Sequence, residues 1–421
     1  MDNILREKGY INLNLYMILP FGAIVLLPSQ YSSLFRFNTP VGELRIDFIF
    51  LLIVLVSMIF LSLKKIYISP FRLLSSLIIL NTLFLIINLA SIFVNGFTLE
   101  MLRYVIYIFI ISFGMIILVG ISWKKVDYHK VIIYSIYFST IVCMIAILEF
   151  FNVFRFYSDL YLEDNVWFSY YEGSSNIRVT SSIGNPLVLS AFLLLMVNVI
   201  LYVKEISAKK VFWYSILLIH FLTILATQSR SAFICLLIIL GYHYFLDIKK
   251  NLTVIFAIII STSTFLVILD YLQADQNFIN RLLFKEQSAS FNIRYEAYLI
   301  AAEMLKDIEI ISFGVGPNRV NSILDTINTR VQTLDNVFLM TFISTGIFGL
   351  LIFTLIFIFI WMKLHNVTYR LKLFGRGLVI TMVVMGFSFN ITYFSAIWGV
   401  FWFYIGIIIM LNSAEKEKVI H

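Results

Sequence analysis

Apolar runs of about 17 or more residues recur along the whole chain, and they constrain the fold more than any other feature. A helix needs roughly 20 residues to cross about 30 Å of hydrocarbon, so each run is long enough for one membrane span. Hydrophobic residues make up 61% of the chain and charged residues 13%, against about 45–50% and about 25% in soluble proteins. No soluble fold could bury so many apolar side chains. The chain is therefore predicted to be a single polytopic membrane domain, residues 1–421.

The backbone must satisfy its own hydrogen bonds in lipid, so the runs are predicted to be helices of an all-α fold. Twelve spans are predicted, at about 12–28, 47–63, 73–94, 101–122, 131–151, 184–203, 211–227, 231–247, 252–271, 337–362, 377–393 and 395–411. The first run is too long for a cleaved signal peptide and lacks a small-residue cleavage site. Cys143 and Cys235 both lie inside apolar runs, which argues against a disulfide framework or a zinc site.

The distribution of lysine and arginine orients the spans. If the N-terminus is cytoplasmic, 19 of the 31 basic residues face the cytoplasm, 15 of them lysines, as the positive-inside rule requires. Twelve spans then place both termini in the cytoplasm. The net charge of +7 is explained by this topology rather than by nucleic-acid binding.

The opposite face carries arginine where the insertion rule disfavours positive charge. Ten of its twelve basic residues are arginines: Arg36, Arg45, Arg103, Arg155, Arg178, Arg230, Arg281, Arg294, Arg319 and Arg330. Arginine presents a planar fork that binds phosphate or carboxylate through two parallel bonds. The set indicates an outward-facing site for a phosphate-bearing substrate. Salt bridges to outer carboxylates, with side chains reaching lipid headgroups, are the simpler alternative for each arginine.

Two long outer loops are predicted, at 152–183 and 272–336, and long loops on a rigid scaffold often carry function. The second loop contains a helical pattern, with Ser290 or Asn292 as its cap. The residues expected to share its apolar face are Tyr295, Tyr298, Leu299, Ala302 and Leu305. This amphipathic helix is expected to lie against the outer membrane surface.

The stretch "ILATQSRSAFICLL" places Arg230 in a turn of a few residues between two spans. It also opens a helix, where the dipole disfavours a cation by about 0.3–1 kcal/mol unless an anion is bound. Arg294 is predicted to lie in the first turn of the loop helix, and Arg178 and Arg103 just before or at the start of spans. Pairing with a carboxylate or interfacial anchoring stays open for each of them.

Candidates for proton transfer are few on the outer face. None of the five histidines falls in an outer loop, so a reaction there uses a carboxylate base or no strong base. Asp335, Glu296 and Glu303 are the candidates. The stretch "FGVGPNRV" lacks the context of a dinucleotide fingerprint and predicts a tight turn that brings backbone close to another group.

The order of "RVTSSIGNP", "TQSRSA", "NIRYEA", "FGVGPNRV" and "DNVFLMTFISTGIFGL" resembles the O-antigen ligase and O-antigen polymerase superfamily of bacterial glycan assembly, over about residues 100–360. Such proteins are similar to GT-C-type membrane glycosyltransferases. The resemblance implies an inner-membrane enzyme whose site faces the periplasm and needs no metal or other cofactor. It implies undecaprenyl-pyrophosphate-linked oligosaccharides as substrates, membrane lipids as surroundings and a chain-length regulator protein as a partner, with no nucleic acid.

The family's arginines correspond to Arg178, Arg230, Arg294 and, with a weaker match, Arg319. Ligases usually have His-Asn where this chain has Asp335-Asn336, and this favours the polymerase branch. Arg230, Arg294, Asp335 and Glu296 are the predicted catalytic residues. The predicted substrate-binding residues are Arg178, Arg230, Arg294, Arg319, Arg103, Asn185 and Asn336. A ligase, or a flippase or secondary transporter of another class, stays an alternative.

Overall fold

The computed structural model describes residues 13–27, 36–39, 42–45, 71–120, 126–151, 178–244, 289–327 and 334–420, with positions 49, 52 and 153. The helices that correspond to predicted spans are α2 (Leu13–Leu26), α4 (Phe71–Val94), α5 (Leu99–Gly120), α6 (Tyr128–Phe150), α9 (Pro186–Ile206), α10 (Lys210–Ala226), α11 (Arg230–Tyr244), α17 (Val337–Lys363), α18 (Tyr369–Gly386) and α19 (Ser395–Ile420). Of the remaining predicted spans, 252–271 lies outside the described residues, and so does 47–63 apart from positions 49 and 52.

By length and composition, 6 of the described helices could cross a membrane, namely α4, α5, α6, α9, α17 and α19. The helices α2, α10 and α11 are apolar but shorter. The described residues are thus mostly helical, as predicted, and the long apolar helices are those of a multi-pass membrane protein. The number of twelve spans, the cytoplasmic termini and the periplasmic loop stay predictions.

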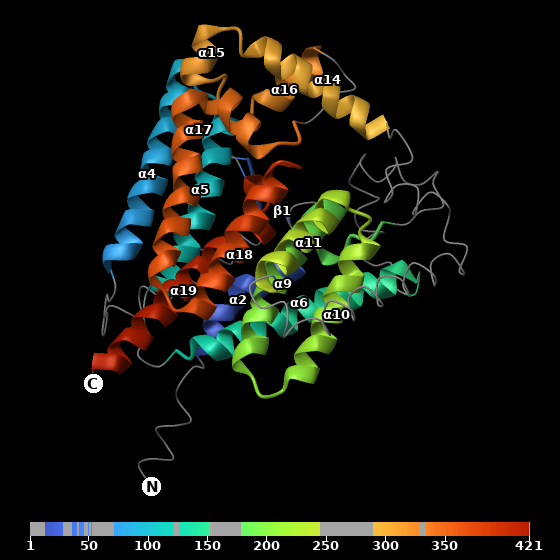
Figure 1. The fold of residues 1–421 in the computed structure, drawn as a ribbon. Helices are drawn as coiled ribbons and strands as arrows, with labels where there is room; N and C mark the ends of the chain where they lie inside the picture. The colour runs from blue at the N-terminus through green and yellow to red at the C-terminus, as the bar shows by residue number, and fades with distance from the viewer. Residues whose placement is uncertain are drawn as a thin grey trace.

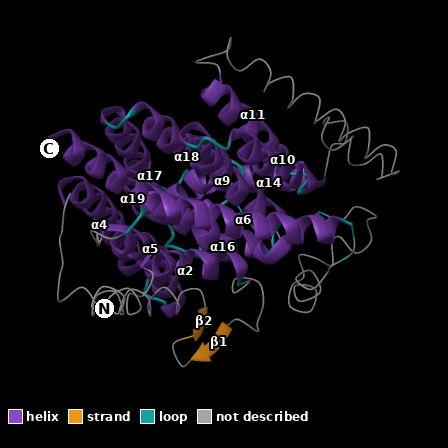
Figure 2. Ribbon diagram, turned by 90° about the horizontal axis from the view of Figure 1, so that it is seen from below, coloured by secondary structure: helices purple, strands orange, loops and turns teal. Residues whose placement is uncertain are grey.

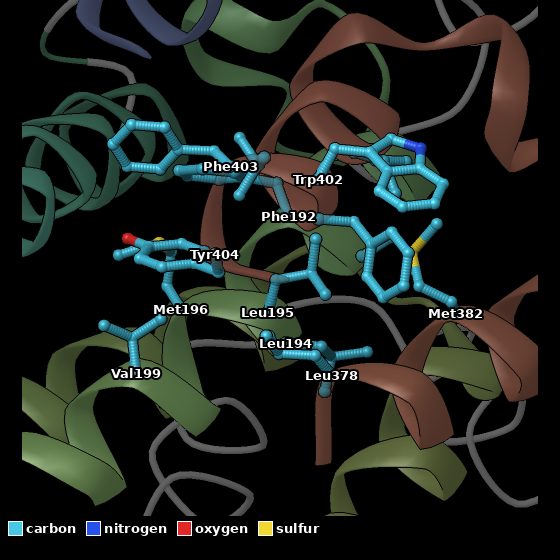
Figure 3. Close-up of a cluster of buried hydrophobic side chains, with 14 of the residues drawn as sticks. Phe192, Leu194, Leu195, Met196, Val199, Leu378, Met382, Trp402, Phe403 and Tyr404 are labelled. Atoms are coloured by element: carbon cyan, nitrogen blue, oxygen red, sulfur yellow. Dashed lines mark hydrogen bonds between the residues drawn. The ribbon is translucent and has the colours of Figure 1, made fainter. Parts of the chain in front are cut away.

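Helices α9 and α19 form the centre of the bundle (Figures 1 and 2). Their apolar windows are 89% and 94% buried, whereas that of the outer helix α4 is only 33% buried. A helix that is apolar on every side belongs in such an interior position. Figure 3 shows Phe192 and Leu195 of α9 packed with Trp402 of α19 and Met382 of α18.

Helix α18 differs from its predicted span, 377–393. It begins at Tyr369 and ends at Gly386, so its first turns contain Arg370, Lys372 and Arg376. The apolar pattern predicted a later start because it excludes basic residues. A helix can nevertheless begin with a basic turn when its later turns are packed in the bundle. Beyond Gly386 a short 3₁₀ helix, η5 (Ile391–Tyr393), leads into α19.

A short hairpin departs from the all-α prediction. Strand β1 (Arg36–Thr39) pairs antiparallel with β2 (Gly42–Arg45), and Arg36 lies opposite Arg45 in the register. Both strands fall in a segment that was predicted only as a connection between spans.

Three helices form a cap at the end of the molecule opposite the C-terminus (Figure 1). They are α14 (Ala289–Met304), α15 (Ile308–Phe313) and α16 (Val320–Ile327). Ala297 and Ala301 of α14 are almost completely buried and belong to a second apolar cluster with Leu334, Met340 and Ile343 around the start of α17. The cap is therefore packed on the bundle through its own small core.

The predicted apolar face of the loop helix is divided: Tyr298 and Leu305 pack against the second apolar cluster, and its place on the membrane surface stays a prediction. Tyr295 and Leu299 are 57% and 53% exposed, whereas the alanines at 297 and 301 face inward. Small residues allow the helix to approach the start of α17 closely. The helix also begins before Ser290 and Asn292, so neither is its cap, and Arg294 lies in its second turn rather than its first.

Glycines join the cap to the bundle by direct backbone contact. Gly346 interrupts α17 with φ 71°, ψ −172°. The loop after α15 inserts at this break: Val315 N donates to Ile343 O (2.8 Å) and Gly316 N donates to Ser344 O (3.0 Å). The turn predicted from "FGVGPNRV" therefore does bring backbone close to another group, which is α17.

Gly314→Ala is expected to destabilise the protein by several kcal/mol and to lower its thermal midpoint. A Cβ there would lie 2.3 Å from the carbonyl carbon of Ser344, and φ is +73°. Gly96→Ala is the matched control, because Gly96 has φ +81° with nothing within 4 Å of the added Cβ. It should lose only the roughly 1–2 kcal/mol of a left-handed conformation. Equal thermal shifts for the two variants would contradict the backbone contact.

Candidate functional site

Arg178 and Arg230 come together at the turn between α10 and α11. The Nε of Arg178 donates to the carbonyl oxygen of Thr227 at 3.0 Å. Thr227 caps the C-terminus of α10, and Arg230 begins α11 three residues later. The turn contains Gln228 with φ 54°. Two arginines that are 52 positions apart in the chain are thus held at one short turn.

The two helix ends act differently on these cations. Arg178 meets the negative end of the α10 dipole, which favours a cation, whereas Arg230 lies at the positive end of α11, which disfavours it. N–H groups at a helix N-terminus and a guanidinium point toward the same anion when one is bound. This turn is therefore suited to a phosphate-bearing ligand.

The segment that follows Arg178 is held by hydrogen bonds to α6. Glu149, in the last turn of α6, accepts hydrogen bonds from Thr180 N (3.1 Å), Thr180 Oγ1 (2.8 Å) and Ser181 N (2.7 Å). Glu149 is 4% exposed. The sequence interpretation missed this residue, although an ionisable residue inside a span is a functional candidate by default.

Arg294 forms a second charged group with Asp335 at the start of α17. Its Nε lies 2.9 Å from Asp335 Oδ2, and the side chains are 38% and 26% exposed. The hydroxyl of Tyr298 lies 3.5 Å from the carbonyl oxygen of Asp335. This carboxylate lies 41 positions away from Arg294 in the chain.

Arg319 and Arg103 are placed differently. Arg319 Nη1 donates to the carbonyl oxygen of Asn95 at 2.7 Å. Asn95 Nδ2 in turn donates to Gly314 O at 2.9 Å. Arg319 thus ties the cap to the end of α4. Arg103 is half-buried at the fifth residue of α5.

The two asparagines predicted to bind substrate are helix caps. Asn185 Oδ1 accepts from the backbone N–H groups of Leu187 and Val188 at the start of α9. Asn336 Oδ1 accepts from those of Phe338 and Leu339 at the start of α17. Of the other candidate bases, Glu303 pairs with Lys306, with both side chains 71% exposed, and Glu296 is half-buried on α14.

Figures 1 and 2 place α14 over the side of the molecule where α10 passes into α11.

Residues 213–354 match the family model described as O-antigen ligase. This confirms the resemblance to the O-antigen ligase and polymerase superfamily. The match covers about a third of the 421 residues, and it does not distinguish the two branches. No curated protein matches the chain.

The superfamily segment contains Arg230, Arg294, Arg319 and Asp335. It begins in α10 and ends within α17, so it includes the α10–α11 turn and the whole cap. Arg178 and Glu149 precede it. Arg178 bonds to Thr227 in the α10–α11 turn, and Glu149 bonds to Thr180.

Proposed function

We propose that this protein is a glycan polymerase at the outer face of the bacterial cytoplasmic membrane. The superfamily match supports a membrane glycosyltransferase of the O-antigen ligase and polymerase type. The observation that carries the proposal is the location of its arginines. Arg230 begins α11 at the turn whose Thr227 carbonyl bonds to Arg178, and Arg294 of the cap pairs with Asp335 at the start of α17.

In the proposed reaction, a sugar hydroxyl of a lipid-linked repeat unit attacks the anomeric carbon of the growing chain. The new glycosidic bond forms as the bond between that carbon and the pyrophosphate oxygen breaks. Undecaprenyl pyrophosphate leaves with the electron pair, and the hydroxyl proton passes to a carboxylate or to water. Stabilising the charge on the leaving group is the main catalytic contribution required of the protein.

Arginines can supply this stabilisation from fixed positions. Each guanidinium has five N–H donors in a planar fork, and a bond from its Nε to a carbonyl or carboxylate orients the fork. Arg178 is oriented by Thr227 O and Arg294 by Asp335. Apolar helices below them would hold the polyprenyl tails in the membrane.

Asp335→Asn separates two roles for this carboxylate. Because Asp335 pairs with Arg294, we expect it to orient the guanidinium, and the substitution should reduce the polymerisation rate by about 10-fold. A general base would contribute about 10²–10⁴-fold. Single-turnover rates of the purified variant give the measurement. A loss within that larger range would assign Asp335 as the base instead of an orienting group.

A ligase that transfers finished glycan to another acceptor is the second candidate, because the matched family model is described as O-antigen ligase. The glycan profile of a deletion strain separates the two functions. Loss of a polymerase leaves single lipid-linked repeat units, whereas loss of a ligase leaves long lipid-linked polymer. Single repeat units are the result expected here, and the accumulation of long polymer would replace the proposal with the ligase.

A further inference from the structure

Glu149 is the one buried carboxylate among the described residues. It lies one residue before the end of α6, in the otherwise apolar stretch "CMIAILEF". Burying a carboxylate is expensive unless hydrogen bonds compensate for its lost hydration. Thr180 and Ser181 supply three hydrogen bonds to it.

The Thr180–Ser182 segment is held in an unusual conformation by these bonds. Ser181 has φ 52°, which is rare for a residue other than glycine. Its hydroxyl donates to Val142 O and that of Ser182 donates to Val25 O, each at 2.8 Å. The segment is thus bonded to α6 and α2, and Glu149 is the charged acceptor that fixes its backbone N–H groups.

Arg178 lies two residues before Thr180, and its Nε bonds to Thr227 O in the α10–α11 turn. Glu149 therefore bonds to Thr180, the chain leads back two residues to Arg178, and Arg178 bonds to the turn that bears Arg230. Releasing Thr180 would release the fork of Arg178 from its position over the turn.

We infer that Glu149 is a positioning residue, which holds the arginine pair of the α10–α11 turn in the geometry that binds a pyrophosphate. This inference rests on the proposed function, since it assigns Glu149 to the same site. It adds a residue of α6 that acts through Arg178 without touching the substrate.

Two substitutions of Glu149 should differ sharply. In Glu149→Gln the amide oxygen can accept the two backbone N–H groups while its nitrogen donates to Thr180 Oγ1, so the rate should stay within about 3-fold of wild type. Glu149→Leu leaves two buried N–H groups without this acceptor. It should reduce kcat on the order of 10²-fold, the effect of misplacing one charge-stabilising group.

A double-mutant cycle with Arg178→Ala tests whether Glu149 acts through the arginine. If it does, Glu149→Leu should cause little further loss in the Arg178→Ala background. The matched control is Asn198→Leu, which disrupts another fully buried polar side chain, bonded to Thr381 on α18. Its effect should multiply with that of Arg178→Ala.

Multiplicative losses for Glu149→Leu and Arg178→Ala would overturn the positioning role, and so would equal losses in Glu149→Gln and Glu149→Leu. Should Glu149→Leu not accumulate as folded protein, Thr180→Val takes its place in the cycle, because it removes only the hydroxyl bond. It should lose several-fold in rate and show the same dependence on Arg178.

Binding of undecaprenyl pyrophosphate to the full-length protein in lipid nanodiscs separates this inference from the proposed function. Suppose that Glu149→Leu weakens binding only when Arg178 is present, and that the wild-type protein makes no polymer. This result would retain the positioning role and reject the polymerase. If the protein polymerises but the rate losses of Glu149→Leu and Arg178→Ala multiply, the polymerase is retained and the positioning role is rejected. If wild-type protein neither binds the lipid nor polymerises, both proposals are wrong.

Discussion

Arg230→Ala is expected to reduce polymerisation on the order of 10²–10³-fold while the protein still folds and inserts. The size follows from removing one preorganised group that stabilises charge in the transition state. The helix dipole predicts no stability penalty, because a cation at the N-terminus of α11 is disfavoured by about 0.3–1 kcal/mol. The measurement is the rate of chain extension at equal protein level in the membrane.

Arg230→Lys should remain at least 10-fold impaired, because lysine keeps the charge but loses the planar fork that binds two oxygens. Arg370→Ala is the matched control, since this arginine is exposed in the first turn of α18. Its rate should equal that of wild type. Normal chain extension in Arg230→Ala would show that the α10–α11 turn does not hold the leaving group.

Arg294→Ala should give a loss of similar size, about 10²-fold or more, for the same electrostatic reason. The stability effect should be small. The pair with Asp335 is partly exposed, at 38% and 26%, and solvent-screened pairs contribute about 0–1 kcal/mol. When both are measured on one preparation, the rate should therefore fall while the thermal midpoint stays nearly unchanged.

Lys306→Ala provides the control on the cap, because Lys306 follows α14 and is 71% exposed in its pair with Glu303. It should leave both quantities unchanged. A rate loss in Arg294→Ala that is matched by an equal loss in Lys306→Ala would indicate a general effect of cap charge rather than a site.

The long helices could be predicted from the sequence because an apolar run is recognised from consecutive residues alone. Helices α4, α5 and α9 coincide with their predicted spans to within a few residues. Packing decides which residues of α14 face the bundle. The burial of Ala297 and Ala301 in place of Tyr295 and Leu299 depends on how closely α14 approaches α17, and periodicity does not contain that distance.

In the candidate site too, single residues could be selected from the sequence, whereas their contacts could not. Arg178 and Arg230 could be selected because arginine is unfavourable at membrane depth on the outer side. Their contact through Thr227, and the pairing of Arg294 with Asp335, depend on chain segments that are 49 and 41 positions apart. Glu149 was overlooked because a single glutamate in an apolar run has no partner visible in the sequence.

We propose that arginines at the α10–α11 turn and on the cap stabilise a departing pyrophosphate. The most direct test reconstitutes purified protein in vesicles with undecaprenyl-pyrophosphate-linked repeat units and follows both products. We expect a ladder of polymer with one undecaprenyl pyrophosphate released per glycosidic bond, and the loss of both in Arg230→Ala. A wild-type reaction that leaves single repeat units, or a ladder undiminished in Arg230→Ala, would contradict this proposal.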